Sequence, residues 1–503
     1  MQPPRPRKQS RMPSDDITTD AASINIQQWL GLIAASMGMF LTSLDITVNV
    51  ALPDITRSLG TDSQTVQWII IFYVGSSTGL QLSLGNAADR YGLKRFYLLG
   101  LVIYALAVLL IGLAPILSMV FALRVLQAVG NGLIMVAVPA LVTNIFPPET
   151  RGRALGLMTG IGALGTVAGA LGGGVLVDHF GWRAIFLGRV PLCILTVFLS
   201  IGSLREAARQ DPQAYDLRGT VVLFIGLVSF ILFLTLGGRN GWAQPYVLLL
   251  LLLSVFSGIA FVYVEKTVPQ PVFDLTLFKH RVLVPVVAAA FLMHLAVFVN
   301  WFILPFYVSD TLNANAKTLG FLLMLMMIIS TVTSPLGGWL SDQMPPAYLT
   351  TLALVITMGS MFWFTQLGAD STVTDVTLRM TAVGLGAGLF QAANATLVMN
   401  SVPSDQLGTG GALLAMSRSM GTVSSVALMG ALFASRLDVH TLALTQQGIV
   451  NAAARSQAFV PAFKDTYGVA AVLAGVAVLV SLSYWPRRLG SDDTAPGAPS
   501  NLL

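Results

Sequence analysis

Residues 85–95 read GNAADRYGLKR, and this short basic turn between two apolar runs guides the interpretation of the whole chain. Its glycines permit a tight turn, because glycine adopts backbone angles that other residues avoid. Asp89 can pair with a basic group or cap the start of a neighbouring helix. The stretch therefore predicts two helices joined by a charged turn that can act as a latch.

The apolar runs on both sides of this turn belong to a long series with the length of membrane spans. The chain is 55% apolar and 10% charged, with a mean hydropathy of +0.75, whereas soluble domains carry about 25% charged residues. A span needs roughly 20 apolar residues. We therefore expect an all-α integral membrane protein with fourteen transmembrane helices, at 29–52, 64–84, 96–114, 116–143, 152–176, 183–203, 218–237, 246–265, 282–307, 318–340, 347–367, 376–401, 408–434 and 466–486.

Basic residues gather on one side of this series. With the N-terminus inside the cell, most Lys and Arg fall in inner segments, among them 5–11, 90–95, 151–153 and 487–488. Positive charge marks cytoplasmic loops, so we expect both termini in the cytoplasm of a multi-pass plasma-membrane protein, in a bacterium the inner membrane. The polar start of the chain is interpreted as a tail, not as a cleaved signal peptide. The longest outer loop is expected at about 435–465.

The two halves of the chain repeat each other. Gly130, Gly132 and Asn144 return 256 positions later as Gly386, Gly388 and Asn400, and the spacing of Gly85 and Asp89 returns at Gly338 and Asp342. Parallel repeats of this kind are typical of transporters. The predicted organisation is a tail (1–28), a six-helix bundle (29–203), two linker helices with their loops (204–281), a second six-helix bundle (282–486) and a second tail (487–503).

The basic turn resembles the cytoplasmic signature of the major facilitator superfamily. The matching residues are Gly85, Asp89, Arg90, Gly92, Lys94 and Arg95. The resemblance implies the major facilitator fold, in which two six-helix bundles alternate access and this turn serves as a conformational latch, here with two extra central helices. In the second half Gln343, Met344 and Pro345 stand where basic residues would follow, so we expect an asymmetric latch.

One carboxylate lies well inside a predicted span. Asp45, Asn49 and Pro53 are four residues apart and share a helix face. Arg124 lies at a similar depth on an oppositely directed helix, about 10 Å below the outer surface. Burial favours the neutral acid and a nearby arginine favours the carboxylate, so protonation would depend on conformation. We expect Asp45 and Arg124 to couple transport to protons; a static ion pair that fixes helix packing is the alternative.

Four helices are expected to line a substrate cavity, because the resemblance implies that the first, fourth, ninth and twelfth of fourteen do so. Each of them carries polar or aromatic side chains within its span. The candidate cavity residues are Asn49, Gln127, Asn131, His294, Phe298, Trp301, Gln391 and Asn394. Ordinary core packing is the alternative for the aromatic stripe and for His294.

The fifth predicted helix carries glycines at intervals that allow close helix contact. Gly165, Gly169, Gly172 and Gly173 resemble the packing motif of the fourteen-helix drug:proton antiporter branch, although Ala170 replaces its proline. The resemblance implies antiport, so we expect proton-coupled export of small amphipathic molecules or drugs. A proton-coupled uptake symporter on the same fold is the alternative, and a channel or receptor is the alternative of another class.

Two further arginines lie in or near spans. Arg189 stands where the antiporter branch has asparagine; it can face an anionic substrate, pair with Asp178 or extend to the interface, and we expect one of the last two. Arg418 can pair across the bundle or neutralise a helix end.

Other classes of function lack support in the sequence. It contains no Walker loop and no HExxH motif, so we expect no enzyme. Cys193 is the only cysteine, which excludes intramolecular disulfides and thiolate metal sites, and we expect no metal and no cofactor. The basic residues form no patch with aromatics, which argues against nucleic acid. The expected partners are a small-molecule substrate, protons and the lipid bilayer; a monomer is compatible with the sequence, which leaves the oligomeric state open.

Overall fold

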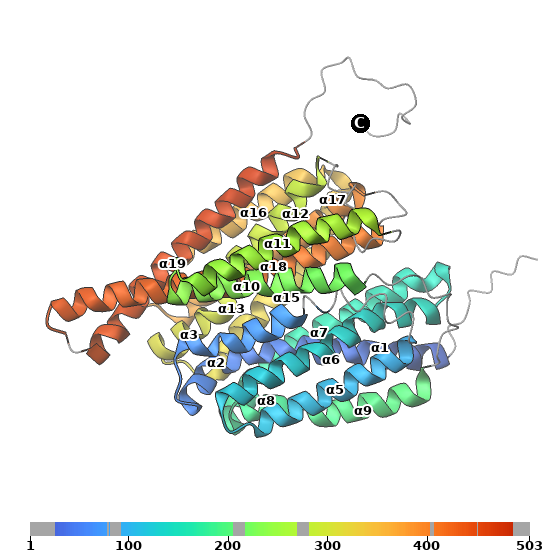
Figure 1. The fold of residues 1–503 in the computed structure, drawn as a ribbon, viewed down its shortest axis with the longest axis horizontal. Helices are drawn as coiled ribbons and strands as arrows, with labels where there is room; N and C mark the ends of the chain where they lie inside the picture. The colour runs from blue at the N-terminus through green and yellow to red at the C-terminus, as the bar shows by residue number, and fades with distance from the viewer. Residues whose placement is uncertain are drawn as a thin grey trace, which may run out of the picture.

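The computed structural model describes residues 26–77, 80, 92–204, 217–268, 281–402, 407–449 and 451–485, and the regular elements among them are all helices (Figure 1). Thirteen helical segments of the described chain are long and apolar enough to cross a membrane. The predicted all-α membrane architecture is therefore confirmed. Figure 1 shows the first half of the chain, from blue to green, lying alongside the second half, from yellow to red.

The first half of the chain folds into helices that pack side by side. They are α1 (Ile26–Ser43), the 3₁₀ turn η1 (Leu44–Ile46), α2 (Thr47–Ser58), α3 (Ser63–Val66), α5 (Leu93–Leu113), α6 (Leu117–Ile145), α7 (Pro148–Phe180), α8 (Arg183–Leu187) and α9 (Arg189–Ser203). Local signals set the helix starts. Asp62 caps α3 by accepting hydrogen bonds from the amides of Gln64 and Thr65, and Pro148 occupies the first turn of α7.

The second half begins with the two linker helices and continues with a second group. The elements are α10 (Leu217–Asn240), α11 (Pro245–Thr267), α12 (Leu283–Val297), α13 (Val299–Phe302), α14 (Leu304–Phe306), the π-helical turn η3 (Tyr307–Thr311), α15 (Ala316–Gln343), α16 (Pro346–Phe364), α17 (Val373–Asn400), α18 (Leu407–Gln446) and α19 (Asn451–Leu482). The linker helices α10 and α11 pack on each other, and α10 also packs on α18. The division into bundles at 203/204 and 281/282 stays a prediction.

The expected second span, at 64–84, is covered only in part. Residues 68–77 are helical, and residues 78–79 and 81–91 lie outside the described chain. The latch residues Gly85, Asp89 and Arg90 therefore also lie outside it. The number of fourteen spans is consistent with thirteen described ones plus this segment.

The expected outer loop at 435–465 is wrong, because most of this stretch is helical. The helices α18 and α19 continue to a turn near residue 448 and form the hairpin that projects at the left of Figure 1. At 1.5 Å per residue, the 40-residue α18 is about 60 Å long. Ion pairs join the two arms, with His440 2.9 Å from Asp465 and Arg455 3.8 Å from Asp438. The alanine-rich composition of 451–463 favours a helix, and this signal was missed.

The two halves touch at the helix ends remote from the chain termini. The contact joins the last turns of α7 to the first turn of α15. A Cβ atom added at Gly174 would lie 2.5 Å from the Ala316 carbonyl oxygen, so the two backbones are in direct contact. The Asp178 carboxylate accepts hydrogen bonds from the amides of Ala316 and Lys317, both at 2.9 Å, and so caps α15 from the other half. The described form is therefore closed at this end.

The glycines of α7 also hold the first span close. A Cβ atom at Gly165 would lie 2.6 Å from the Phe40 carbonyl oxygen, and Gly169 and Gly173 face Leu44 and Thr47 in the same way. The backbone of α7 thus lies directly against η1 and its neighbouring turns. Gly172 was predicted to join this contact, but it has no neighbour within 4 Å of its Cβ position because it points away from the first span.

We predict that Gly165→Ala destabilises the protein whereas Gly172→Ala does not. The new methyl group at 165 would collide with backbone, and overpacking of this kind costs about 1–3 kcal/mol. At 172 the methyl group meets open space and improves helix propensity by up to about 1 kcal/mol. Thermal unfolding of both purified variants in detergent measures the difference. Equal unfolding temperatures would contradict the close packing of α7 on the first span.

Candidate functional site

Asp45 lies at a break in the first span. The helical span Ile26–Ser58 changes to 3₁₀ geometry at Leu44–Ile46, and Asp45 is the central residue of that turn. Short 3₁₀ stretches inside helices often mark hinges. The residue is only 8% exposed, so its carboxyl group depends on protein partners for hydrogen bonds.

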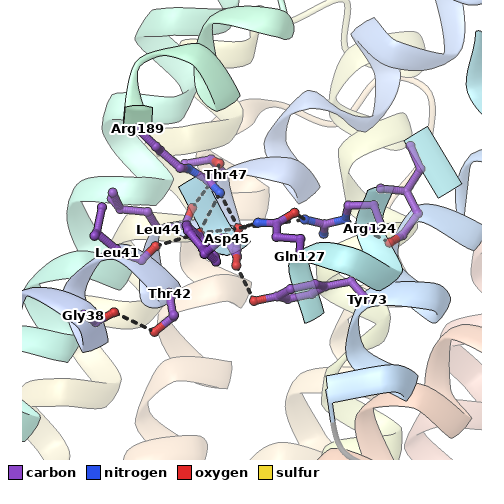
Figure 2. A network of polar contacts seen from close by, with 12 residues as sticks. Gly38, Leu41, Thr42, Leu44, Asp45, Thr47, Tyr73, Arg124, Gln127 and Arg189 are labelled. Atoms are coloured by element: carbon purple, nitrogen blue, oxygen red, sulfur yellow. Dashed lines mark hydrogen bonds and ion pairs between the residues drawn. The ribbon is translucent and has the colours of Figure 1, made fainter. Parts of the chain in front are cut away.

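Five side chains surround the Asp45 carboxyl group, and Figure 2 labels four of them: Tyr73, Arg124, Gln127 and Arg189. Arg189 Nη1 and the Tyr73 hydroxyl donate hydrogen bonds to it. Gln127 Nε2 donates at 2.7 Å and the Tyr104 hydroxyl at 3.1 Å, both to Oδ1. The fifth is Arg124, whose Nη1 lies 3.8 Å from Oδ1. These donors come from four separate helical segments, so the carboxyl group joins much of the first half of the chain.

Arg124 lies behind Gln127 as seen from Asp45. Its Nη1 donates to Gln127 Oε1 at 2.7 Å, its Nε donates to the Ile69 carbonyl at 3.2 Å, and its guanidinium stacks 4.2 Å from the centre of the Tyr73 ring. The structure thus brings Arg124 close to Asp45, as the sequence predicted. The arginine that donates directly to the Asp45 carboxyl group, however, is Arg189.

The prediction for Arg189 is wrong. This side chain is 3% exposed, so it does not extend to the interface, and Asp178 is engaged with α15. Arg189 instead donates to Asp45, to the Leu44 carbonyl at 2.7 Å and to the Thr47 hydroxyl. The sequence feature that could have identified this pairing was the depth of Arg189 within its span. Arg189 lies about 9 Å into its span, level with Asp45, and an arginine within the bilayer needs a carboxylate.

The side chains around Asp45 carry fewer negative than positive charges. One carboxylate faces two guanidinium groups, and all three are at least nine-tenths buried. Each arginine also donates to neutral oxygens, which compensates part of its desolvation. Adding a proton to Asp45 would remove the only negative charge among these groups, so protonation has large consequences for their interactions.

A second concave region lies in the other half of the chain. A pocket of about 110 Å³ is lined by the predicted residues His294, Phe298, Trp301 and Gln391. The structure therefore brings four cavity candidates together, from α12, α13 and α17. The lining also includes Met293, Met326, Met327 and Ser330, which the sequence analysis did not single out. Methionines make adaptable surfaces for varied apolar ligands.

The remaining candidates are not among the residues that line this pocket. Gln127 binds Asp45, and Asn131 donates to the Ser77 hydroxyl at 2.6 Å. Asn49 is buried on α2, with no hydrogen-bond partner for its Oδ1 in the described chain. Asn394 is fully buried on α17. The aromatic and amide candidates thus divide between a pocket in one half and polar contacts elsewhere.

The described latch residues have local roles. Gly92 has a φ of +100°, which favours glycine, and it precedes α5. Lys94 Nζ donates to the carbonyls of Ile201 and Leu204 at 2.9 and 2.6 Å, at the end of α9. A cation there is stabilised by the helix dipole. Arg95 lies in the first turn of α5.

A larger hollow lies at the closed end. It has a volume of about 390 Å³, and its lining includes Val50, Asp54, Arg57, Asp178 and Asn315. Val50 follows Asp45 by five residues, or roughly 7 Å along a helix. In the described part of the chain, no group of three or more His, Cys, Asp or Glu side chains is placed to hold a metal ion.

Comparison with known proteins gives consistent matches. The family profile of the Major Facilitator Superfamily matches residues 29–426. The chain is 26% identical over 467 residues to the riboflavin transporter RibZ of Clostridioides difficile, covering 91% of this chain and 98% of that protein. It is 26% identical over 430 residues to the tetracenomycin C resistance and export protein of Streptomyces glaucescens, covering 84% and 79%.

A solved structure matches over the same extent. The crystal structure of a bacterial homologue of the human lysosomal transporter Spinster aligns with a TM-score of 0.67 at 16% identity, covering 91% of this chain and 98% of that chain. At this identity the match supports the fold alone.

We predict that Arg189→Gln lowers stability more than Arg124→Gln does. The first removes the direct ionic partner of a buried carboxylate, at a cost of about 3 kcal/mol. The second leaves that pair intact and orphans two neutral acceptors, at a cost of about 1–2 kcal/mol. Unfolding temperatures in detergent rank the two variants. A larger loss for Arg124→Gln would show that the sequence-based pairing of Asp45 with Arg124 was the better description.

Proposed function

Because the chain belongs to the major facilitator superfamily, we propose that it exports small amphipathic molecules, drugs among them, in exchange for protons. The observation that carries the proposal is the buried Asp45 carboxylate bound by Arg189 inside a membrane span. A carboxylate is costly in hydrocarbon and is retained where its charge has a use. We assign the chain to the fourteen-helix drug:proton antiporter branch, supported by the thirteen described spans and the relative named for resistance and export.

Protonation of Asp45 is the coupling step. A neutral acid loses its ionic attraction to Arg189, while Arg189 keeps its bonds to the Leu44 carbonyl and the Thr47 hydroxyl. Because these two residues flank Asp45 at the 3₁₀ turn, loss of the ion pair acts directly on the break in the first span. Proton occupancy and the shape of this span are thereby linked, and such linkage is what an exchanger needs.

Alternating access gives the site one route to the outside of the cell and one route to the inside. With both termini in the cytoplasm, the closed end of the described form faces outside. The lining of the 390 Å³ hollow there includes Val50, five residues beyond Asp45 in the first span, and we assign this hollow to the entry route for protons. Export then follows from proton entry outside, substrate release outside and proton release inside. We place the protein in the plasma membrane, with the 85–95 turn controlling the switch between states.

The substrate side of the proposal rests on the pocket at α12, α13 and α17. His294, Phe298, Trp301 and Gln391 combine aromatic surface with two polar groups, which suits an amphipathic ligand. The 110 Å³ volume is smaller than that of drug-sized sites, which are about 300–1,000 Å³. We therefore interpret it as one subsite of the cavity in this closed form.

Proton-coupled uptake is the second candidate. The relative named as a riboflavin transporter covers most of this chain, and its name does not imply resistance. The same Asp45 arrangement would serve a symporter, with proton and substrate moving together. The direction of substrate-induced proton movement separates the two candidates, because antiport and symport give opposite signs.

We predict that Asp45→Asn abolishes proton-coupled transport and retains ligand binding. A dye is first chosen by efflux from cells with and without the protein, from cationic, neutral and anionic examples. Dye-induced proton movement is then recorded in proteoliposomes. Asn keeps a similar shape but cannot exchange a proton, so the signal should vanish. The Asp465→Asn variant, at a 41%-exposed carboxylate on the hairpin, is the matched control and should retain it.

Folding of the variant needs its own check, because Asn at 45 leaves two buried guanidinium groups without a counter-charge. That loss costs about 3–5 kcal/mol. Combining Asp45→Asn with Arg189→Asn removes one of the charges and should recover part of the unfolding temperature. Persistent proton movement in the folded single or double variant would overturn the role given to Asp45.

A further inference from the structure

Arg418 on α18 differs from the other arginines described within spans. Arg124 and Arg189 have several acceptors each, and Arg379 donates to the carbonyls of Trp363 and Asp375 at 2.9 and 2.7 Å. In contrast, Arg418 Nε and Nη2 are closed to solvent and have no hydrogen-bond partner among the residues that the structure describes. The side chain as a whole is partly exposed, but buried guanidinium nitrogens without acceptors are costly. Its retention suggests a ligand or partner absent from this form.

The position of Arg418 is set by contacts on both sides of it. Ser417 Oγ donates to the Val287 carbonyl at 2.7 Å, and a Cβ atom at Gly421 would touch the Phe291 carbonyl and His294. The face of α18 that carries these residues thus lies against α12. Gly421, three residues beyond Arg418 on α18, lies directly against His294. Since His294 lines the 110 Å³ pocket, Arg418 lies beside that pocket, on the side of the chain termini.

Asn394 supplies a second unsatisfied polar group, on the neighbouring helix α17. Its side chain is fully buried, and neither Nδ2 nor Oδ1 has a hydrogen-bond partner in the described chain. A Cβ atom at Gly410 would contact Val398 and Val402. The antiparallel helices α17 and α18 therefore have Gly410 at the same height along the bundle as these two valines. Counting 1.5 Å per residue from that contact places Asn394 within about one turn of the level of Arg418.

We propose that Arg418 and Asn394 bind the acidic group of an aromatic, anionic substrate whose ring lies in the pocket of His294, Phe298 and Trp301. This inference rests on the proposed transport function and names its substrate class. A guanidinium and an amide N–H are both donors that suit a carboxylate, phosphate or phenolate. The aromatic lining of the adjacent pocket suits a planar ring. A cationic substrate would meet the charge of Arg418 and be disfavoured.

Two xanthene dyes of opposite charge test the proposal. Fluorescein is anionic and tetramethylrhodamine methyl ester is cationic, and their ring systems are closely similar. Binding to the full chain in detergent is measured by fluorescence polarisation, which needs no proton gradient. We expect tighter binding of fluorescein and an affinity loss of tenfold or more in Arg418→Gln, as for a lost charged hydrogen bond. Arg418→Lys should retain part of the preference.

A matched variant and a second readout separate binding from folding. Arg455→Gln, on the hairpin, replaces a half-exposed arginine and should bind both dyes as the wild type does. Because Arg418 lacks partners in the described chain, Arg418→Gln should unfold at the same temperature as the wild type or higher. A large fall in that temperature would show a structural partner, and the proposal would be wrong. Equal binding of the two dyes by the wild type would also overturn it.

Failure of the anion-site proposal is distinguishable from failure of the transport proposal. If Arg418→Gln loses fluorescein binding while Asp45→Asn keeps it, the anion site stands whatever the coupling ion is. If the wild type couples movement of the cationic dye to protons and ignores fluorescein, export stands and the anion site is rejected.

Discussion

The buried ion pair between Asp45 and Arg189 is the interaction on which the first half of the molecule depends. It lies at the 3₁₀ break in the first span and is supported by Tyr73, Tyr104 and Gln127. Removing either partner would leave an uncompensated charge in a region closed to water, which is strongly destabilising. In the proposed function, this constraint is what couples the site to a single proton.

The packing around this pair connects it, through α7, to the contact between the two halves. The glycines of α7 bring that helix against Phe40, Leu44 and Thr47, and so against the break itself. The far end of α7 contacts α15 across the two halves, where Asp178 caps the partner helix. One helix thus touches both the Asp45 region and the closed end. A change at the break has a direct mechanical route to the contact that keeps the halves together.

The sequence predicted the membrane architecture and the burial of Asp45 within a span, because both follow from the cost of placing groups in hydrocarbon. The family resemblance implied one cavity lined by eight residues, and the structure brings four of them together, His294, Phe298, Trp301 and Gln391. The sequence predicted that Arg124 lies near Asp45 but not the direct pair with Arg189, since helix rotation decides which of two arginines at equal depth faces the carboxylate. Asp178 was misjudged because the two backbone amides that donate to it lie in the other half. The α18–α19 hairpin was missed because its polar residues resemble a loop.

Infrared difference spectroscopy tests the central claim most directly, by asking whether Asp45 changes its protonation when ligand binds. Spectra of the reconstituted protein would be recorded with and without a transported dye. The account predicts a change in the carbonyl band of a protonated carboxylic acid, present in the wild type and absent in Asp45→Asn. An unchanged band in the wild type, or the same change in the variant, would mean that Asp45 holds the fold through Arg189 and carries no proton.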